Sequence, residues 1–164
     1  PDAVREVAAL AADPSAPVRL WVAASLGGFP EQAVQHLPVL GEFLKDSDER
    51  VAVQALNTIR PLGTAARPLA GAVKTATADA RERVRAAALV VLPGLSDGPD
   101  EELQRKLVAE ATDPGAPLRT RLAAIESLGR TRASPETLAV LLAVASDSDR
   151  VLRSAALDSL IKLG

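Results

Sequence analysis

The stretch Asp13-Pro14-Ser15-Ala16-Pro17-Val18-Arg19 returns as Asp113-Pro114-Gly115-Ala116-Pro117-Leu118-Arg119. Looser copies begin at Asp46, Asp79 and Asp147, so that successive aspartates lie 33, 33, 34 and 34 residues apart. A fixed period of this size is typical of one small unit that is stacked on itself. The sequence therefore predicts an array of repeats, in which the core is a continuous strip.

Each repeat contains two stretches whose apolar residues follow helical spacing. In the first stretch, which follows the aspartate, Val51, Leu56 and Ile59 share one helical face. The second stretch leads into the next aspartate, as Leu103, Leu107 and Ala111 do before Asp113. We predict an all-α fold, a right-handed α-solenoid (superhelix) of about ten antiparallel helices in five pairs, with residues 1–164 forming a single repeat domain.

Two places depart from this regular pattern. Pro38 lies inside a second stretch, where proline interrupts a helix. We therefore expect a short turn at about residues 31–35 and a main helix from about Leu37. Two extra residues must also be absorbed between Asp113 and Leu128, which predicts a shifted helix start there.

Four glycines fall near the ends of the first helical stretches. A left-handed helix cap is easiest for glycine, so we expect such caps at Gly28, Gly63, Gly94 and Gly129.

The composition excludes several classes of protein. The chain has no cysteine, which rules out disulfides and thiolate metal sites, and its net charge of −2 gives no overall basic field for nucleic acid. No apolar run reaches the length of a membrane span. Because the chain begins at Pro1 and contains no methionine, we expect a fragment of a longer protein, and the lack of cysteine favours a cytoplasmic location.

The pattern Asp-Pro-x-x-x-Val-Arg followed by Ala-Ala-x-Leu-Gly resembles the HEAT repeat, and within it the bacterial HEAT-like form named after phycobilisome lyases. Its best copy runs from Asp13 through Val18-Arg19 and Ala23-Ala24 to Leu26-Gly27. The resemblance covers essentially the whole chain and implies a HEAT-like stack. Ala52 replaces the usual arginine in the second unit. Ankyrin and tetratricopeptide repeats fit worse, because their signature residues are absent.

The repeated aspartates and nearby arginines form a ladder, to which we give two interpretations. An aspartate before a helix can accept hydrogen bonds from the first free N–H groups, and it can pair with an arginine of its own or the next unit. A row of arginines that binds anions is the alternative. The ladder consists of Asp13, Arg19, Asp46, Asp79, Arg85, Asp113, Arg119 (or Arg121), Asp147 and Arg153.

We predict no catalytic residue, no cofactor and no metal site, and therefore no enzyme activity. Asp46-Ser47-Asp48 begins like a calcium loop, but Val51 stands where such a loop requires glycine. His36 is the only histidine, whereas zinc and iron sites usually need several histidine or cysteine ligands. Arg119, Arg121, Arg130 and Arg132 form the only basic cluster and have no aromatic companion, which argues against a nucleic-acid site.

A repeat array without reactive groups predicts a scaffold that binds another protein or another domain of the same parent chain, with no membrane partner. Its second helices should line the concave face. A nucleic-acid-binding or lyase-type enzyme fragment is the alternative. Trp21 either covers a helix junction or forms an exposed contact. The candidate partner contacts are Trp21, Gln35, His36, Arg67, Lys74, Arg105 and Lys106, with further polar positions at Gln32, Glu42, Glu102, Glu136 and Thr137.

Overall fold

The computed structural model of the chain describes residues 2–96, 98 and 100–164, and it divides into two compact units, Pro1–Leu95 and Ser96–Gly164. The first unit contains α1 (Asp2–Ala9), η1 (Leu10–Ala12), α2 (Ala16–Gly27), α3 (Pro30–Ala33), η2 (Val34–His36), α4 (Leu37–Phe43), α5 (Glu49–Ile59), η3 (Arg60–Leu69), α6 (Ala70–Ala76), α7 (Glu82–Val91) and η4 (Leu92–Leu95), where η marks a 3₁₀ segment. The second contains α8 (Glu101–Thr112), α9 (Leu118–Leu128), α10 (Pro135–Val144) and α11 (Arg150–Leu163).

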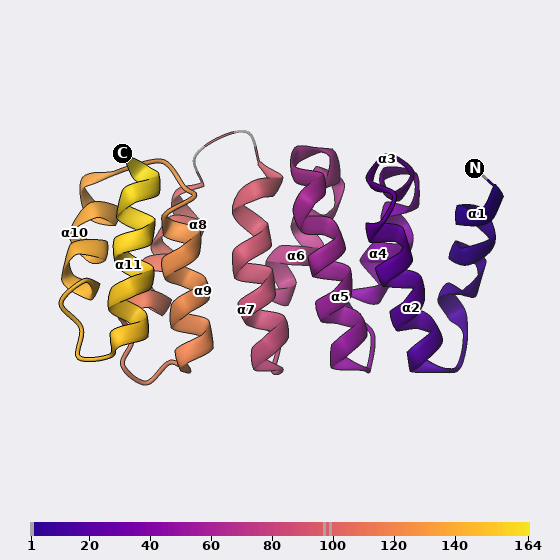
Figure 1. Cartoon of the computed structure of the whole chain (residues 1–164), viewed down its shortest axis with the longest axis horizontal. Helices are drawn as coiled ribbons and strands as arrows, with labels where there is room; N and C mark the ends of the chain where they lie inside the picture. The colour runs from indigo at the N-terminus through magenta and orange to yellow at the C-terminus, as the bar shows by residue number, and fades with distance from the viewer. Residues whose placement is uncertain (1, 97, 99) are drawn as a thin grey trace. The chain divides into compact units, whose positions relative to one another are not determined.

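The described residues form helices and turns without strands, which confirms the predicted all-α repeat fold (Figure 1). We call α2, α5, α7, α9 and α11, which follow the repeated aspartates, first-type helices. The second-type helices are α1, α4, α6, α8 and α10. Together they match the ten predicted helices, and the four-residue α3 is an additional short segment. Whether the two units act as one domain stays a prediction.

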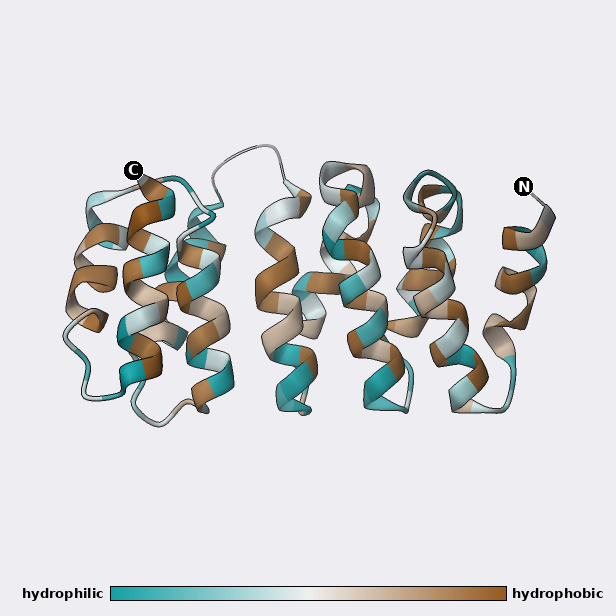
Figure 2. Cartoon of the chain, in the orientation of Figure 1, coloured by the Kyte–Doolittle hydropathy of each residue, from teal (hydrophilic) through white to brown (hydrophobic). Residues whose placement is uncertain are grey.

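The core of the first unit lies between its two rows of helices. First-type helices α2, α5 and α7 contact one another in sequence, and second-type helices α4 and α6 pack behind them (Figure 1). Leu26, Leu56 and Leu89 point into this layer and are fully buried. Figure 2 shows the result on the ribbons, where brown apolar residues recur at helical intervals between teal polar ones. Small side chains such as Ala55 let the helices approach closely.

The second unit repeats this arrangement with two helix pairs. Helix α9 packs against α8 and α11, and α10 packs against α8 and α11. Its fully buried side chains are Leu107, Ile125, Leu128, Leu141 and Leu152. Each unit therefore has an aliphatic core of its own.

The proline at position 38 breaks the second stretch where the sequence predicts it. Helix α3 and the turn η2 end at His36, and α4 begins at Leu37, which places Pro38 in its first turn. Proline is tolerated there because the N–H that it lacks has no partner within the helix. The expected short turn and the helix start at about Leu37 are confirmed.

The predicted shift between Asp113 and Leu128 moves the start of α9. Because α9 begins at Leu118, Thr120 takes the buried place that Val51 and Val84 occupy two residues after the starts of α5 and α7. The side chain of Thr120 is buried, and its hydroxyl oxygen has no hydrogen-bond partner in the described part of the chain. The shift therefore leaves a polar atom in an apolar position.

Neighbouring first-type helices approach most closely at a recurring contact between a hydroxyl and a glycine. The Oγ1 of Thr58 in α5 donates to the carbonyl of Ala23 in α2 at 2.8 Å. The Oγ of Ser159 in α11 donates to the carbonyl of Ile125 in α9 at 3.0 Å. A Cβ on Gly27 would lie 3.0 Å from Thr58 Oγ1, so both contacts need a small residue four positions after the accepting carbonyl.

Three of the four expected left-handed glycine caps are wrong. Only Gly63 has a positive φ, of 54°, whereas Gly28 and Gly129 are right-handed and Gly94 is not among the positive-φ residues. At Gly129 the constraint is close approach rather than backbone conformation, because a Cβ there would lie 2.6 Å from the Cβ of Ser159.

Gly129→Ala should destabilise the second unit by about 2–3 kcal/mol, because overpacking of this size displaces a helix backbone. The new Cβ would also meet the Cα of Ser159 at 2.8 Å, so α11 has to move. Urea unfolding followed by circular dichroism measures the change. Gly71→Ala is the matched control, since nothing lies within 4 Å of its Cβ. This control should gain about 0.5 kcal/mol from reduced chain entropy; equal effects at both sites would contradict the contact.

Thr120→Val should stabilise the chain by about 1 kcal/mol, because it replaces an unsatisfied buried hydroxyl by a methyl group of similar shape. Thr58→Val makes the same change where the hydroxyl donates to Ala23, and it should cost about 1 kcal/mol. Opposite signs in denaturant unfolding are expected. A loss of stability in Thr120→Val would show that its hydroxyl is satisfied in solution.

Candidate functional site

The repeated aspartates all close the same tight turn before a first-type helix. The Oδ1 of Asp46 accepts the N–H of Asp48 at 2.8 Å, and Asp79 accepts the N–H of Arg81 at the same distance. The other three aspartates of the ladder accept in the same way from the residue two positions ahead, at 2.8 Å. This is the Asx-turn geometry, so the ladder aspartates do not bond the helix N–H groups themselves. Asp48 and Asp149, one step later, do so at α5 and α11.

Arg19 joins two consecutive turns of the first unit. Its Nη1 donates to the carbonyls of Asp13 and Pro14 at 2.9 and 3.1 Å, which ties the arginine to its own turn. Its Nε and Nη2 donate to the two carboxylate oxygens of Asp46 at 2.6 and 2.8 Å. The paired donors match a carboxylate in the bidentate manner that only arginine provides. One side chain therefore sets the spacing between two repeats.

The second junction of this unit uses another arginine, because Ala52 stands where the pattern has arginine. Arg81 holds the carboxylate of Asp79 with its Nε and Nη2 at 2.9 and 2.8 Å. Its Nη1 reaches back to the carbonyl of Asp46 at 2.7 Å. Arg81 thus links the two turns from the opposite side, a role that the sequence pattern did not reveal.

In the second unit the arginine that reaches the next aspartate is Arg121. Its Nη2 donates to Asp147 at 2.9 Å, and its Nε donates to the carbonyl of Ala111. Arg119 is exposed, and no hydrogen bond or ion pair involves it among the described residues. The late start of α9 is the reason, because it moves the inward arginine position by two residues. Of the two candidates that the sequence left open, the structure places Arg121 in the ladder.

These contacts depress the acidities of the ladder carboxyls. The Arg19 guanidinium and the Asp48 N–H hold the pKa of Asp46 below its ordinary value despite partial burial. Arg81 lowers the pKa of Asp79 in the same way, and Arg50 lowers the pKa of Asp48 to about 2. For Asp147 the N–H of Asp149 is the larger cause of the lowered pKa, and Arg121 is the smaller.

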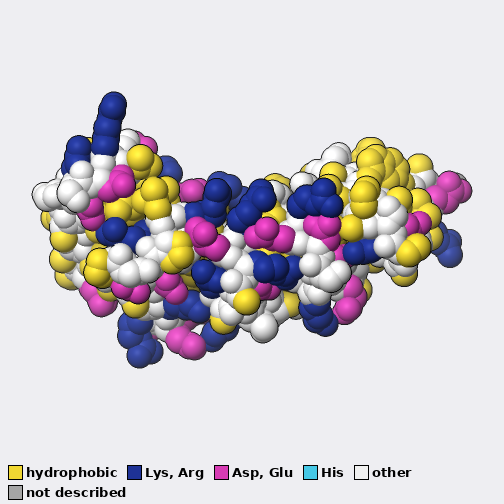
Figure 3. All heavy atoms as spheres, turned by 90° about the horizontal axis from the view of Figure 1, so that it is seen from below, with side chains coloured by type: hydrophobic (Ala, Val, Ile, Leu, Met, Phe, Trp, Pro, Cys, Tyr) yellow, Lys and Arg dark blue, Asp and Glu magenta, His cyan; other side chains and the backbone are white. Residues whose placement is uncertain are grey.

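The charges at the turns are mixed in sign. In Figure 3, side chains of lysine and arginine are interspersed with those of aspartate and glutamate over the visible face, without a field of one sign. The guanidinium groups of Arg19, Arg81 and Arg121 are engaged by carboxylates and carbonyls. Such an arrangement is suited to joining repeats and offers little for an external anion.

Grooves lie between consecutive second-type helices in both units. In the first unit an apolar groove of about 280 Å³ runs between η1 and α4, lined by Ala11, Ala12, Pro38, Val39, Glu42 and Phe43. In the second unit a polar hollow of about 410 Å³ lies at the starts of α8 and α10, with Glu101, Arg105 and Glu136 around it.

The predicted contact residues are distributed over this second-type surface, with one clear correction. Thr137 is fully buried, and its Oγ1 accepts from the Nε2 of Gln104 at 2.7 Å. It therefore joins α8 to α10 and is not available to a partner. Gln104 also donates to Ser134, a network that the sequence analysis missed. The remaining predicted contacts on second-type segments are exposed or half-buried: Gln32, Gln35, His36, Glu42, Arg67, Lys74, Glu102, Arg105, Lys106 and Glu136.

Trp21 lies on α2 with 55% of its surface exposed. It therefore does not act as a covered helix-junction residue within the first unit. None of the described helices is long and apolar enough to cross a membrane. Within the same residues, no group of three or more histidine, aspartate or glutamate side chains is placed to hold a metal ion.

The repeated turn, the helix pairs and the arginine junctions together point to one family. Residues 4–93 and 69–161 match the family model for HEAT repeats. The chain belongs to the HEAT-repeat family. No curated protein matches it in sequence. The resemblance found in the Asp-Pro and Leu-Gly motifs is thus confirmed.

Solved structures with the same fold share little sequence with this HEAT-repeat chain. An engineered protein is 15% identical, with a TM-score of 0.71 over 98% of this chain and 78% of its own. A designed armadillo repeat protein in complex with the peptide (KR)4 is 18% identical, with a TM-score of 0.66 over 99% and 82%. Human deoxyhypusine hydroxylase is 22% identical, with a TM-score of 0.56 over 99% and 62%. These likenesses establish the fold alone.

Asp46→Asn keeps an acceptor for the Asp48 N–H but removes the charge that Arg19 binds. Because the folded pKa of Asp46 is depressed, its ion pair stabilises fully above the ordinary value of about 3.9. That stability is lost as the pH falls through the folded pKa. The variant should have a lower urea midpoint than the wild type at pH 7, and the difference should close toward pH 2. Asp158→Asn, at an exposed site on α11, should change neither midpoint; a gap that persists at pH 2 would contradict the ion pair.

Proposed function

We propose that the chain is a protein-binding scaffold without catalysis of its own, which uses the surface of its second-type helices. The observation that carries this proposal is a division of labour between two surfaces. The turns before the first-type helices use their charged groups in junctions such as Arg19 with Asp46. The second-type helices keep grooves and exposed polar side chains.

The groove between η1 and α4 has the chemistry of a site for an aliphatic side chain. Ala11, Ala12, Val39 and Phe43 give it apolar walls, and Glu42 stands at its edge. An apolar hollow with a few polar groups at its rim is the usual anatomy of a recognition pocket. A protein segment that carries an aliphatic residue next to a basic one fits both features.

The similar structures agree with this proposal only at the level of the fold. The designed armadillo protein binds a peptide of alternating lysine and arginine, as its description states. The hydroxylase shows that a related stack can belong to an enzyme. No described feature of this chain favours the alternative of a nucleic-acid-binding or lyase-type enzyme fragment.

The scaffold proposal predicts that binding depends on the second-type surface. Immobilised wild-type chain and two variants, Ala12→Glu in the groove and Ala24→Glu on α2, are compared as baits in extracts of the source cells. Both alanines are exposed, so the substitutions are matched. Proteins retained by the wild type and by Ala24→Glu should be lost with Ala12→Glu because a carboxylate enters the apolar groove. Equal retention by all three baits would contradict the proposal.

A further inference from the structure

The face of α11 that is turned away from α9 is apolar and exposed. Leu157 and Ile161 are 52% and 78% exposed. Leu157 lies four residues after Arg153, just as Ile125 lies four residues after Arg121 in α9. Ile125 is fully buried, and its carbonyl accepts the Ser159 hydroxyl of the next first-type helix. The face of α11 is thus the kind of face that another first-type helix covers elsewhere in the unit.

Arg153 carries a second half of the same pattern. Its Nη1 donates to the carbonyls of Asp147 and Ser148 at 2.8 and 2.7 Å, as Arg19 does with its own turn. In Arg19 the Nε–Nη2 edge then holds the carboxylate of the following aspartate. In the described part of the chain that edge of Arg153 has no partner. The geometry calls for a carboxylate at the start of a further repeat.

The complementary groups lie on α1, α2 and the turn between them. Asp13 uses Oδ1 for the Ser15 N–H, and no arginine of the described residues binds its carboxylate. Asp13 is the first aspartate of the ladder, and Asp46, at the next step, holds an arginine. Ser25 is the place on α2 that Thr58 has on α5, and its hydroxyl has no partner in the described part of the chain.

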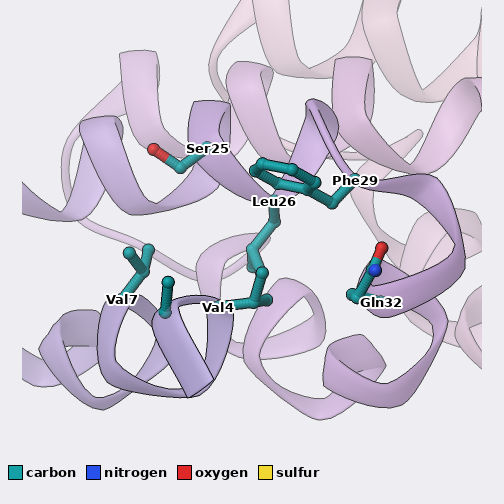
Figure 4. Close-up of a pocket in the computed structure, with 7 residues that line it drawn as sticks. Val4, Val7, Ser25, Leu26, Phe29 and Gln32 are labelled. Atoms are coloured by element: carbon teal, nitrogen blue, oxygen red, sulfur yellow. The ribbon is translucent and has the colours of Figure 1, made fainter. Parts of the chain in front are cut away.

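An apolar pocket adjoins Ser25. It has a volume of about 170 Å³ and is lined by Val4 and Val7 of α1, by Leu26 of α2 and by Phe29. In Figure 4 these side chains border the hollow together with Ser25 and Gln32. A cavity of about 150 Å³ is enough to hold benzene, so a branched aliphatic side chain such as that of Ile161 fits.

We propose that the chain associates head to tail with further copies of itself, α1 and α2 of one copy packing on α10 and α11 of another. Arg153 of the first copy binds Asp13 of the second as Arg19 binds Asp46. The Ser25 hydroxyl donates to the carbonyl of Leu157, as Thr58 does to Ala23. Ile161 enters the pocket beside Ser25.

The order of helix types at the two faces allows this stack to continue in register. The pair α10–α11 is a second-type helix followed by a first-type helix, and α1–α2 has the same order. The exposed Leu138 and Leu142 of α10 then face α1, while Leu157 faces α2. Such an interface joins two different surfaces, so each added copy leaves both surfaces available and the assembly grows beyond a dimer.

A second copy is favoured over an unrelated partner because both halves of each contact are present on this chain. The unpaired guanidinium edge has its unpaired aspartate, the protruding isoleucine has its pocket, and the carbonyl position has its hydroxyl. These surfaces are distinct from the second-type groove of the proposed scaffold, so either proposal can fail while the other stands.

Sedimentation velocity at low salt tests the association, because screening weakens exposed ion pairs. Wild-type chain at increasing concentration should exceed twice the 17.0 kDa monomer mass. Asp13→Arg alone and Arg153→Asp alone should stay monomeric, since each places like charges in the interface.

An equimolar mixture of these two variants should associate again. The aspartate introduced at position 153 of one variant then meets the arginine introduced at position 13 of the other. The native pair of Arg153 and Asp13 also forms between the two variants, because each of them keeps one native member. A wild type that remains monomeric near 1 mM, single variants that still associate, or a mixture that does not would overturn the proposal.

A second pair of variants covers the case in which Arg153→Asp loses its turn and unfolds. Ile161→Asp replaces a residue that is 78% exposed, so folding is preserved, and it should abolish association. Leu118→Asp, also at an exposed apolar site of the second unit, should leave association unchanged. Association that survives Ile161→Asp overturns the proposal.

The single tryptophan gives an independent measure of the same interface. Trp21 lies four residues before Ser25 and shares its face of α2. Its fluorescence should shift to shorter wavelength as wild-type chains associate, because assembly removes the ring from water. Asp13→Arg should show no shift at any concentration. A wild-type spectrum that stays constant while the mass increases would place the contact elsewhere and overturn the proposal.

Discussion

The stack depends on arginine side chains that bind two consecutive turns at once. Arg19 fixes its own turn through backbone carbonyls and the following turn through the carboxylate of Asp46. Because a guanidinium is planar and its donors are rigidly spaced, the two turns are held at one separation. That separation accounts for the nearly constant interval of 33 or 34 residues between the aspartates. A longer or shorter unit would pull the fork from the carboxylate.

The first-type helices impose a second constraint, which explains the unusual composition. Thr58 and Ser159 insert hydroxyls against the backbone of the preceding helix, and Gly27 and Gly129 leave the space. A bulky residue at these contacts would separate the helices and open the core. The chain therefore fills its interior with alanine, valine and leucine, and only one of its three aromatic residues, Phe43, is buried.

The sequence predicted the features that are local or periodic. The aspartate interval indicated the repeat, apolar spacing indicated the helices, and Pro38 indicated the break before α4. It failed where a role depends on a residue some 35 positions away. Gly129 reads as a helix cap until Ser159 is placed against it, and Arg81 reads as a surface residue until it reaches the carbonyl of Asp46. Thr137 looked exposed because helical spacing alone did not reveal Gln104.

The same logic separates binding surfaces from structural ones in this HEAT-repeat chain. A motif that recurs at every step is consumed inside the stack, as the fork of Arg19 is by Asp46. It becomes a recognition element only where no following turn binds it, as at Arg153. The ladder is therefore structural between repeats and adhesive at its unpaired groups. The second-type surface, which varies from repeat to repeat, is left to distinguish partners.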